Sequence, residues 1–279
     1  MAVGTIAQLW QQVQQLFQPP KSFRFRGFPV DPVLAQRTGA PQEHYAAFAA
    51  VHERLLATLT PVEPHHVVLE AGCGTGMDAI LLSQRIKPPG RYTGFDIAPD
   101  NIAWCTAHIA RRLRHYRFHH FDIRNETYNP TGTVDPTSIR FPEADGAVDR
   151  FIAQSVFTHL LTDVTAHYLA EVRRVLRPDG LALVTCFLAT PEEITRSAES
   201  PVPVFQFTHE HTSGVYISDP HRPSESVAYE RETFARLLSD AGLTMTTVVP
   251  GYWAIGRAMG DIGQDIVVLA RTPARGDAR

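Results

Sequence analysis

The residues with the most specific chemistry form a glycine-rich turn. Gly72, Gly74 and Gly76 alternate with other residues directly after the apolar run 67–71. Because glycine has no Cβ, the backbone at these positions can adopt positive φ and approach a ligand closely. The amide N–H groups at the start of a following helix would face that ligand. The spacing predicts a nucleotide-binding turn between a strand and a helix.

A carboxylate lies where such a turn needs one. Asp96 comes twenty residues after Gly76, at the end of a second short apolar run. At that position in an open α/β sheet, a carboxylate can accept hydrogen bonds from two ribose hydroxyls. A P-loop is not indicated, because no Gly-Lys-Ser or Gly-Lys-Thr follows. Dinucleotide binding fits poorly, since the third glycine comes one residue early and the acidic Glu70 precedes the turn.

The elements that must position these residues are β-α units. From His65 onward, short apolar runs alternate with amphipathic stretches, which favours an α/β fold with a mostly parallel sheet and helices on both faces. The seven expected strands cover 67–70, 91–96, 117–120, 147–153, 181–187, 244–249 and 265–271. The expected helices cover 76–86, 100–113, 162–176 and 230–241.

The chain divides into four parts around this sheet. Residues 1–60 read as an N-terminal helical cap with helices over 5–18 and 42–59, which either packs on the sheet or acts as a lid. Residues 61–190 form the core. Residues 191–229 are rich in proline, serine and histidine and read as an insertion, an acceptor-side loop. Residues 230–279 supply the last helix and the closing strands of the same core.

Several stretches resemble a known family. Residues 67–76, VVLEAGCGTG, resemble motif I of class I S-adenosylmethionine-dependent methyltransferases, which have a Rossmann-like fold. The stretch 92–97, YTGFDI, resembles their ribose-binding strand, and 121–123, FDI, resembles the strand that contacts adenine. Residues 148–160 resemble the fourth strand, and 176–185 resemble the turn into the fifth. The resemblance covers about 67–187 and implies S-adenosylmethionine as the cofactor.

The resemblance assigns residues to parts of this cofactor. It implies that Glu70 lies near the methionine amino group and that Gly72 and Gly74 approach the methionine part. Asp96 would bind the ribose, and Asp122 would accept a hydrogen bond from the adenine amine.

The same resemblance extends to further positions. Cys73 and Gly76 belong to the same turn, and Gln154 would lie close to the sulfonium. Ile97 and Ile123 would sandwich the adenine ring, although core packing explains two isoleucines equally well.

His159 is the candidate catalytic residue. It follows the fourth strand on the cofactor side of the sheet, where a histidine with a pKa near ~6.5 can act as a general base. Its alternative role is to brace the next helix. A metal site is not expected, because the histidines of the insertion (His209, His211, His221) lack the spacing of a zinc motif.

Charge and loops favour a small-molecule acceptor. The formal net charge is −3, so the chain has no broad basic field for nucleic acid. We expect methyl transfer to oxygen in a sugar or secondary metabolite. The alternatives are an RNA or protein methyltransferase, a catalytically idle cofactor-binding scaffold, and a nicotinamide-dependent oxidoreductase.

The remaining expectations concern compartment and assembly. Cys73, Cys105 and Cys186 show no close pairing, which favours a reducing compartment, the cytoplasm. The first twenty residues do not read as a signal peptide, and no stretch reads as a membrane span. We expect no membrane partner, and a monomer or a homodimer.

Overall fold

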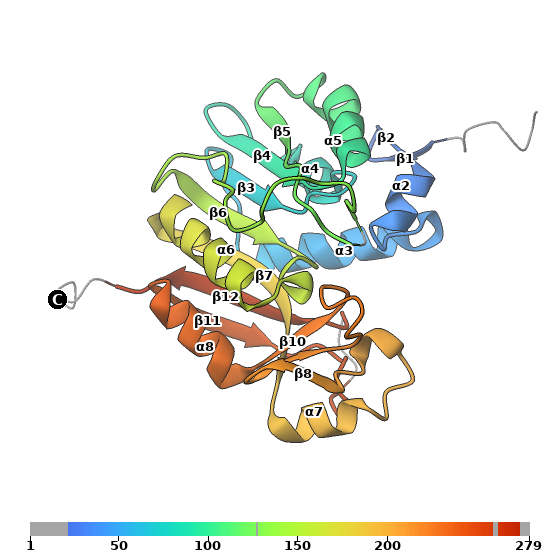
Figure 1. Cartoon of the computed structure of the whole chain (residues 1–279). Helices are drawn as coiled ribbons and strands as arrows, with labels where there is room; N and C mark the ends of the chain where they lie inside the picture. Colours follow the sequence, from blue (N-terminus) through green and yellow to red (C-terminus); the bar gives the residue numbers. More distant parts are fainter. Residues whose placement is uncertain (1–21, 127, 259–261, 274–279) are drawn as a thin grey trace, which may run out of the picture.

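The computed structural model describes residues 22–126, 128–258 and 262–273 (Figure 1). The helix expected over 5–18 lies outside these residues. The described N-terminal part is a small hairpin of β1 (Phe23–Phe25) and β2 (Phe28–Val30), followed by α2 (Pro32–Arg37) and α3 (Gln42–Leu59). The helix expected over 42–59 is therefore confirmed. None of the described helices has the length and apolar composition needed to cross a bilayer.

The first β-α units follow the predicted order. They comprise β3 (Val67–Ala71), α4 (Met77–Leu82), β4 (Arg91–Asp96), α5 (Pro99–Cys105) with a π-helical turn (Thr106–Ala110), β5 (Tyr116–His120), β6 (Val148–Ala153), α6 (Thr162–Val175) and β7 (Leu176–Ala189). The rest comprises α7 (Pro191–Ser197), β8 (His209–Thr212), β9 (Val215–Ile217), β10 (Val227–Glu230), α8 (Arg231–Asp240), β11 (Leu243–Val249) and β12 (Asp265–Arg271). Short 3-10 turns cover Phe157–His159 and Pro203–Phe205.

Seven of these strands form the expected sheet. β5, β4, β3, β6 and β7 lie side by side and are parallel. β12 pairs antiparallel with β7 and with β11. The Rossmann-like α/β fold with a mixed, mostly parallel central sheet is confirmed.

The segment 191–229 corrects an expectation, because it is not simply a loop. It contains α7, β8 and β9 and leads into β10, and these strands raise the sheet from seven strands to ten. β12 pairs with β7 at residues 181–186 only, so the last residues of β7 have open backbone groups that β10 pairs in parallel. The edge strand β8 is polar and exposed. Its sequence therefore lacks the apolar alternation that identifies a half-buried strand.

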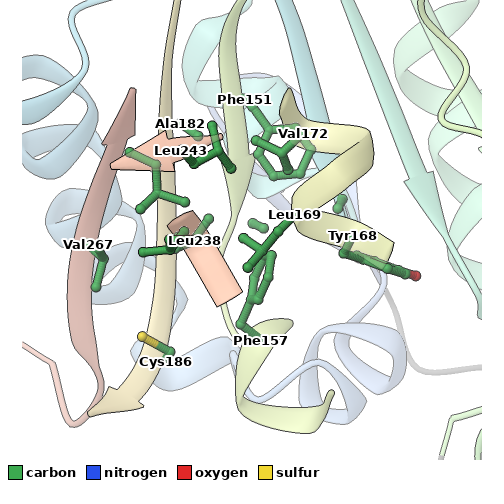
Figure 2. Close-up of a cluster of buried hydrophobic side chains, with 14 of the residues drawn as sticks. Phe151, Phe157, Tyr168, Leu169, Val172, Ala182, Cys186, Leu238, Leu243 and Val267 are labelled. Atoms are coloured by element: carbon green, nitrogen blue, oxygen red, sulfur yellow. The ribbon is translucent and has the colours of Figure 1, made fainter. Parts of the chain in front are cut away.

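The strands bury alternate residues on opposite faces, as a pleated sheet requires. Leu69, Phe151 and Val267 point to the side covered by α6 and α8, whereas Val68 and Ile152 point to the side covered by α3 and α4. Figure 2 shows the first side, where Leu169 and Val172 of α6 and Leu238 of α8 pack against the sheet. Helices on both faces leave the carboxyl edge of the parallel strands as the place for a site.

Candidate active site

A cavity of about 630 Å³ lies at the carboxyl edge of the parallel strands. Its volume falls in the range of about 300–1,000 Å³ typical of small-ligand sites. Six of the ten predicted cofactor residues line it, together with the predicted base His159: Gly72, Gly74, Asp96, Ile97, Ile123 and Gln154. The sheet thus brings together residues that are up to 87 positions apart, from Gly72 to His159.

The glycine turn presents bare backbone to this cavity. Gly72 has φ +67° and Gly74 has φ +50°, both in the left-handed region. A Cβ on Gly72 would lie 2.5 Å from the Val156 side chain, and one on Gly74 would lie 3.2 Å from that of Thr38. Val156 and Thr38 line the cavity as well. Side chains at the two glycines would therefore crowd the cavity wall.

Gly76 and Cys73 serve packing instead, and neither lines the cavity. Gly76 has φ +80°, and a Cβ there would collide with Ile109 and lie 3.1 Å from the Cys105 sulfur. Cys73 is buried, and burial raises the pKa of its thiol well above the usual range. The third glycine of the turn allows close approach of the helix that follows β4.

Asp96 lies at the end of β4 with both oxygens oriented by the backbone. Oδ2 accepts a hydrogen bond from the Gly74 amide and Oδ1 accepts one from the Ala98 amide, both at 2.8 Å. Burial raises the pKa of Asp96, and these amide donors oppose that rise. The Asn101 side chain and the Ile97 amide are further donors that lower the pKa of this carboxylate. The carboxylate is thus held in one orientation at the cavity wall.

Asp122 does not line the cavity. Its Oδ1 accepts a hydrogen bond from the Asn129 amide at 3.1 Å, and its Oδ2 accepts one from the Thr133 hydroxyl at 2.8 Å. These bonds lower its pKa, with the Thr133 hydroxyl as the largest cause. In this structure the Asp122 carboxylate holds the loop after β5 in place. Its neighbour Ile123 lines the cavity.

Glu70 also points away from the cavity. It is 4 % exposed, and it accepts a hydrogen bond from the Tyr92 hydroxyl within the core. Burial and the nearby Asp78 raise the pKa of Glu70 well above its usual range. A buried carboxyl with a raised pKa fits a structural role better than direct contact with a cationic amino group.

Gln154 belongs to a polar cluster that the sequence analysis missed. Its Nε2 lies 2.6 Å from Asp78 Oδ2 and 2.9 Å from His52 Nδ1. His52 Nδ1 in turn lies 2.9 Å from Asp78 Oδ1. His52 comes from α3 and Asp78 from α4, so no local motif links them to Gln154. The one available signal was the acid in the first turn after the glycine turn.

His159 lines the cavity where the loop after β5 meets the segment 191–229. Its Nδ1 is 3.0 Å from the Ser224 carbonyl oxygen. A carbonyl only accepts, so Nδ1 carries the proton and Nε2 of the neutral ring is the basic nitrogen. Burial lowers the pKa of His159. The Tyr128 ring contacts the imidazole edge-on with ring centroids 5.5 Å apart.

The same wall includes two further polar groups that the sequence did not identify. The Ser224 hydroxyl donates to Glu126 at 2.8 Å, and both residues line the cavity. Ser224 belongs to the segment 191–229, so part of this segment does reach the cavity. Within the described residues, no group of three or more His, Cys, Asp or Glu side chains is placed to hold a metal ion.

Comparison with known proteins decides the family. Residues 68–180 match the methyltransferase-domain family. Over 214 residues the chain is 28% identical to a probable S-adenosylmethionine-dependent methyltransferase of Mycolicibacterium smegmatis, covering 76% of this chain and 70% of the relative. The chain belongs to the class I S-adenosylmethionine-dependent methyltransferases. The recognition made from the motifs is confirmed.

Other relatives of this methyltransferase carry more specific names. It is 23% identical over 222 residues to an arsenite methyltransferase of Halobacterium salinarum, covering 77% of this chain and 48% of the relative. The fold resembles that of geranyl diphosphate C-methyltransferase from Streptomyces coelicolor, with a TM-score of 0.51, 16% identity, and 97% and 100% of the two chains covered. At that identity the likeness concerns the fold.

The cofactor of this methyltransferase is S-adenosylmethionine. The residues present fit it. Two glycines leave bare backbone that a Cβ would obstruct, and backbone amides orient the Asp96 carboxylate at the cavity wall. Ile97 and Ile123 supply apolar cavity walls for an adenine ring.

Proposed function

We propose that this methyltransferase transfers a methyl group to a hydroxyl of a small molecule, a sugar or a secondary metabolite. The observation that carries the proposal is His159, a neutral imidazole beside the cavity with its Nδ1 proton bound to Ser224. A hydroxyl acceptor must lose its proton during methylation, and a positioned imidazole nitrogen can accept it.

The division of work follows from this arrangement. S-adenosylmethionine supplies a methyl group on a positively charged sulfur, which makes its carbon electrophilic. The glycine turn and Asp96 bind the adenosyl part, so that the reacting carbon is held in one position. His159 Nε2 accepts the hydroxyl proton of the acceptor. The Ser224 carbonyl keeps the proton on Nδ1, which preserves the basic tautomer.

The acceptor side combines an aromatic ring with polar groups. The Tyr128 side chain is 42% exposed and lines the cavity beside Glu126 and Ser224. An aromatic face packs against the apolar face of a sugar or a ring system, and the carboxylate and hydroxyl pair with its hydroxyls. This composition favours a hydroxylated acceptor.

Other acceptors receive less support. Arsenic binds thiolates, and none of Cys73, Cys105 and Cys186 lines the cavity. RNA would require a basic surface, whereas the formal net charge is −3.

The test is a methyl-transfer assay with radiolabelled S-adenosylmethionine against a panel of sugars, sugar nucleotides and phenols, with bulk RNA and protein extract in parallel. We expect label in one of the small-molecule classes, with the methyl group on oxygen by mass spectrometry. Label confined to RNA or protein, or to nitrogen or carbon, would contradict the proposal. Cofactor binding without transfer to any acceptor would favour the scaffold alternative.

A further inference from the structure

Two arginines meet at the turn of the N-terminal hairpin. Arg24 Nη1 donates a hydrogen bond to the Gly27 carbonyl oxygen at 2.9 Å, and Arg112 Nη1 donates to the same oxygen at 2.8 Å. Arg24 belongs to β1, whereas Arg112 follows the π-helical turn after α5. The hairpin lies beside α5 (Figure 1). The fold therefore brings two guanidinium groups from distant parts of the chain to one atom.

The positions of both groups are fixed by the hairpin. Arg26 and Gly27 have φ +48° and +82°, as the two-residue turn of a tight hairpin requires. This turn holds the shared carbonyl. The Arg112 guanidinium also lies over the buried Phe28 ring, with its carbon 4.5 Å from the ring centroid. In the described part of the chain, each guanidinium has one nitrogen in a hydrogen bond, so most of its N–H donors are left for a ligand.

No acid balances these two charges. Among the residues that the structure describes, neither arginine forms an ion pair. Glu53 on α3 reaches the hairpin, but it pairs with Arg26 at 2.6 Å. The segments that contain the two arginines, residues 1–30 and 101–121, include no Asp or Glu. Because both Nη1 atoms bond one oxygen, they lie within about 6 Å of each other, a range in which like charges disfavour each other.

We propose that Arg24 and Arg112 form a binding site for a phosphoryl group, carried by a small phosphate monoester or by inorganic phosphate. A phosphoryl group has nearly two negative charges at neutral pH and several acceptor oxygens, so it can bind both guanidinium groups and relieve their repulsion. A carboxylate has one charge and balances only one of them. Neither arginine lines the cavity, so this site is separate from the active site and independent of the methyl acceptor.

Two observations favour a single phosphoryl group over a nucleic acid. The next cation along the hairpin, Arg26, is already paired with Glu53, and the formal net charge of −3 opposes a long polyanion. A phosphoryl group bound to both arginines joins the hairpin to the helix after β4. Asn101 of that helix lines the cavity, so the occupied site braces an element of the active site.

The test is a titration of the full chain with inorganic phosphate and with glycerol phosphate, followed by phosphorus NMR at constant ionic strength. S-adenosylhomocysteine is present throughout to fill the cofactor site. We expect saturable binding, of the ester if the source is a metabolite and of inorganic phosphate alone if the source is the free ion. Arg24→Gln and Arg112→Gln should each weaken this binding about tenfold or more, because each removes charge-assisted hydrogen bonds. Both arginines are exposed, and circular dichroism checks that the variants fold.

The matched control is Arg114→Gln, which makes the same charge change two positions from Arg112. Arg114 is exposed and, within residues 22–126, 128–258 and 262–273, has no hydrogen bond to the hairpin. Its replacement should change the affinity by less than about twofold, because exposed charges are screened. An equal loss in Arg114→Gln, or unchanged affinity in a folded Arg24→Gln or Arg112→Gln protein, would overturn the proposal. So would the absence of saturable binding of both probes at millimolar concentrations, or tighter binding of a single-stranded RNA oligonucleotide than of either probe.

Discussion

The Asp96 carboxylate accepts a hydrogen bond from the backbone amide of Gly74 at 2.8 Å. This bond joins the end of β4 to the glycine turn after β3, two neighbouring parallel strands. The carboxylate that we expect to bind the ribose and the bare backbone of the glycine turn are therefore one unit. A change in the carboxylate affects both.

The first prediction concerns this unit. Asp96→Asn replaces one of the two carboxylate oxygens by an NH2 group, so only one of the Gly74 and Ala98 amides keeps its acceptor, and it weakens the pairing with a ribose diol. We expect binding of S-adenosylhomocysteine to weaken by about 1–3 kcal/mol, measured by calorimetry. Asp100→Asn, an exposed acid on α5, is the matched control and should leave binding unchanged. A folded Asp96→Asn protein with wild-type affinity would reject the ribose role.

The second prediction concerns the proposed base. His159→Ala should lower kcat by about 10²–10⁴-fold, the usual contribution of a general base. The control is His167→Ala, because His167 also bonds a backbone carbonyl, at 2.8 Å, but does not line the cavity. Unchanged turnover in His159→Ala would leave this histidine with a bracing role only.

The third prediction is the pH dependence of the same step. The neutral imidazole is the active form, and burial lowers the pKa of His159. Activity should therefore fall with decreasing pH only below about 6.5, the ordinary histidine value, and reach a plateau above it. The measurement is kcat/KM against pH. A midpoint above the ordinary value, or the same acid limb in His159→Ala, would assign the titration to another group.

The fourth prediction separates backbone strain from packing in the glycine turn. Gly76→Ala incurs about 1–3 kcal/mol for positive φ and about 1–3 kcal/mol for overpacking against Ile109 and Cys105. Gly146 has φ +61° with open space around a Cβ, so Gly146→Ala incurs only the strain. Urea unfolding should show the larger loss for Gly76→Ala. Equal losses of stability in the two variants would mean that the helix after β4 shifts to make room for the Cβ added at position 76.

The fifth prediction concerns the support of the last strand. Asp265 is fully buried at the start of β12, and Arg257 Nη1 lies 2.5 Å from its Oδ1. Arg257→Met leaves this acid without its cation, so the free energy of unfolding should fall by about 3–5 kcal/mol. Arg222→Met removes a half-exposed arginine that pairs with Asp219 and Glu225, and should cost less than about 1 kcal/mol. Similar losses in both variants would show that the Arg257–Asp265 ion pair contributes no more to stability than a surface ion pair.

Local sequence was sufficient for the parts of the site that depend on one strand end. The glycine turn and Asp96 were recognisable because a parallel sheet brings successive strand ends to one edge. The strand-end argument also located His159, and the family resemblance added Ile97, Ile123 and Gln154; all four line the cavity. Asp122, which came from the same resemblance, does not line it, because the partners that hold its carboxylate, Asn129 and Thr133, come from the loop that follows.

The segment 191–229 shows a second limit. Its strand β10 forms because β7 extends past the end of β12 and leaves backbone groups unpaired. The residues of β10 do not indicate how far β7 extends beyond the end of β12. The same applies to Ser224, which reaches His159 across 65 positions of sequence.

By itself, the sequence determined the family, the cofactor and the order of the β-α units, because these depend on short patterns of glycine, acid and apolar spacing. Only the tertiary structure decided which of the acids meets the cavity. Glu70 and Asp122 turn toward partners of their own, and Asp78 contacts Gln154 and a histidine from the N-terminal helix. The physical reason is that a carboxylate takes its role from the donors around it, and those donors come from elements distant in the chain.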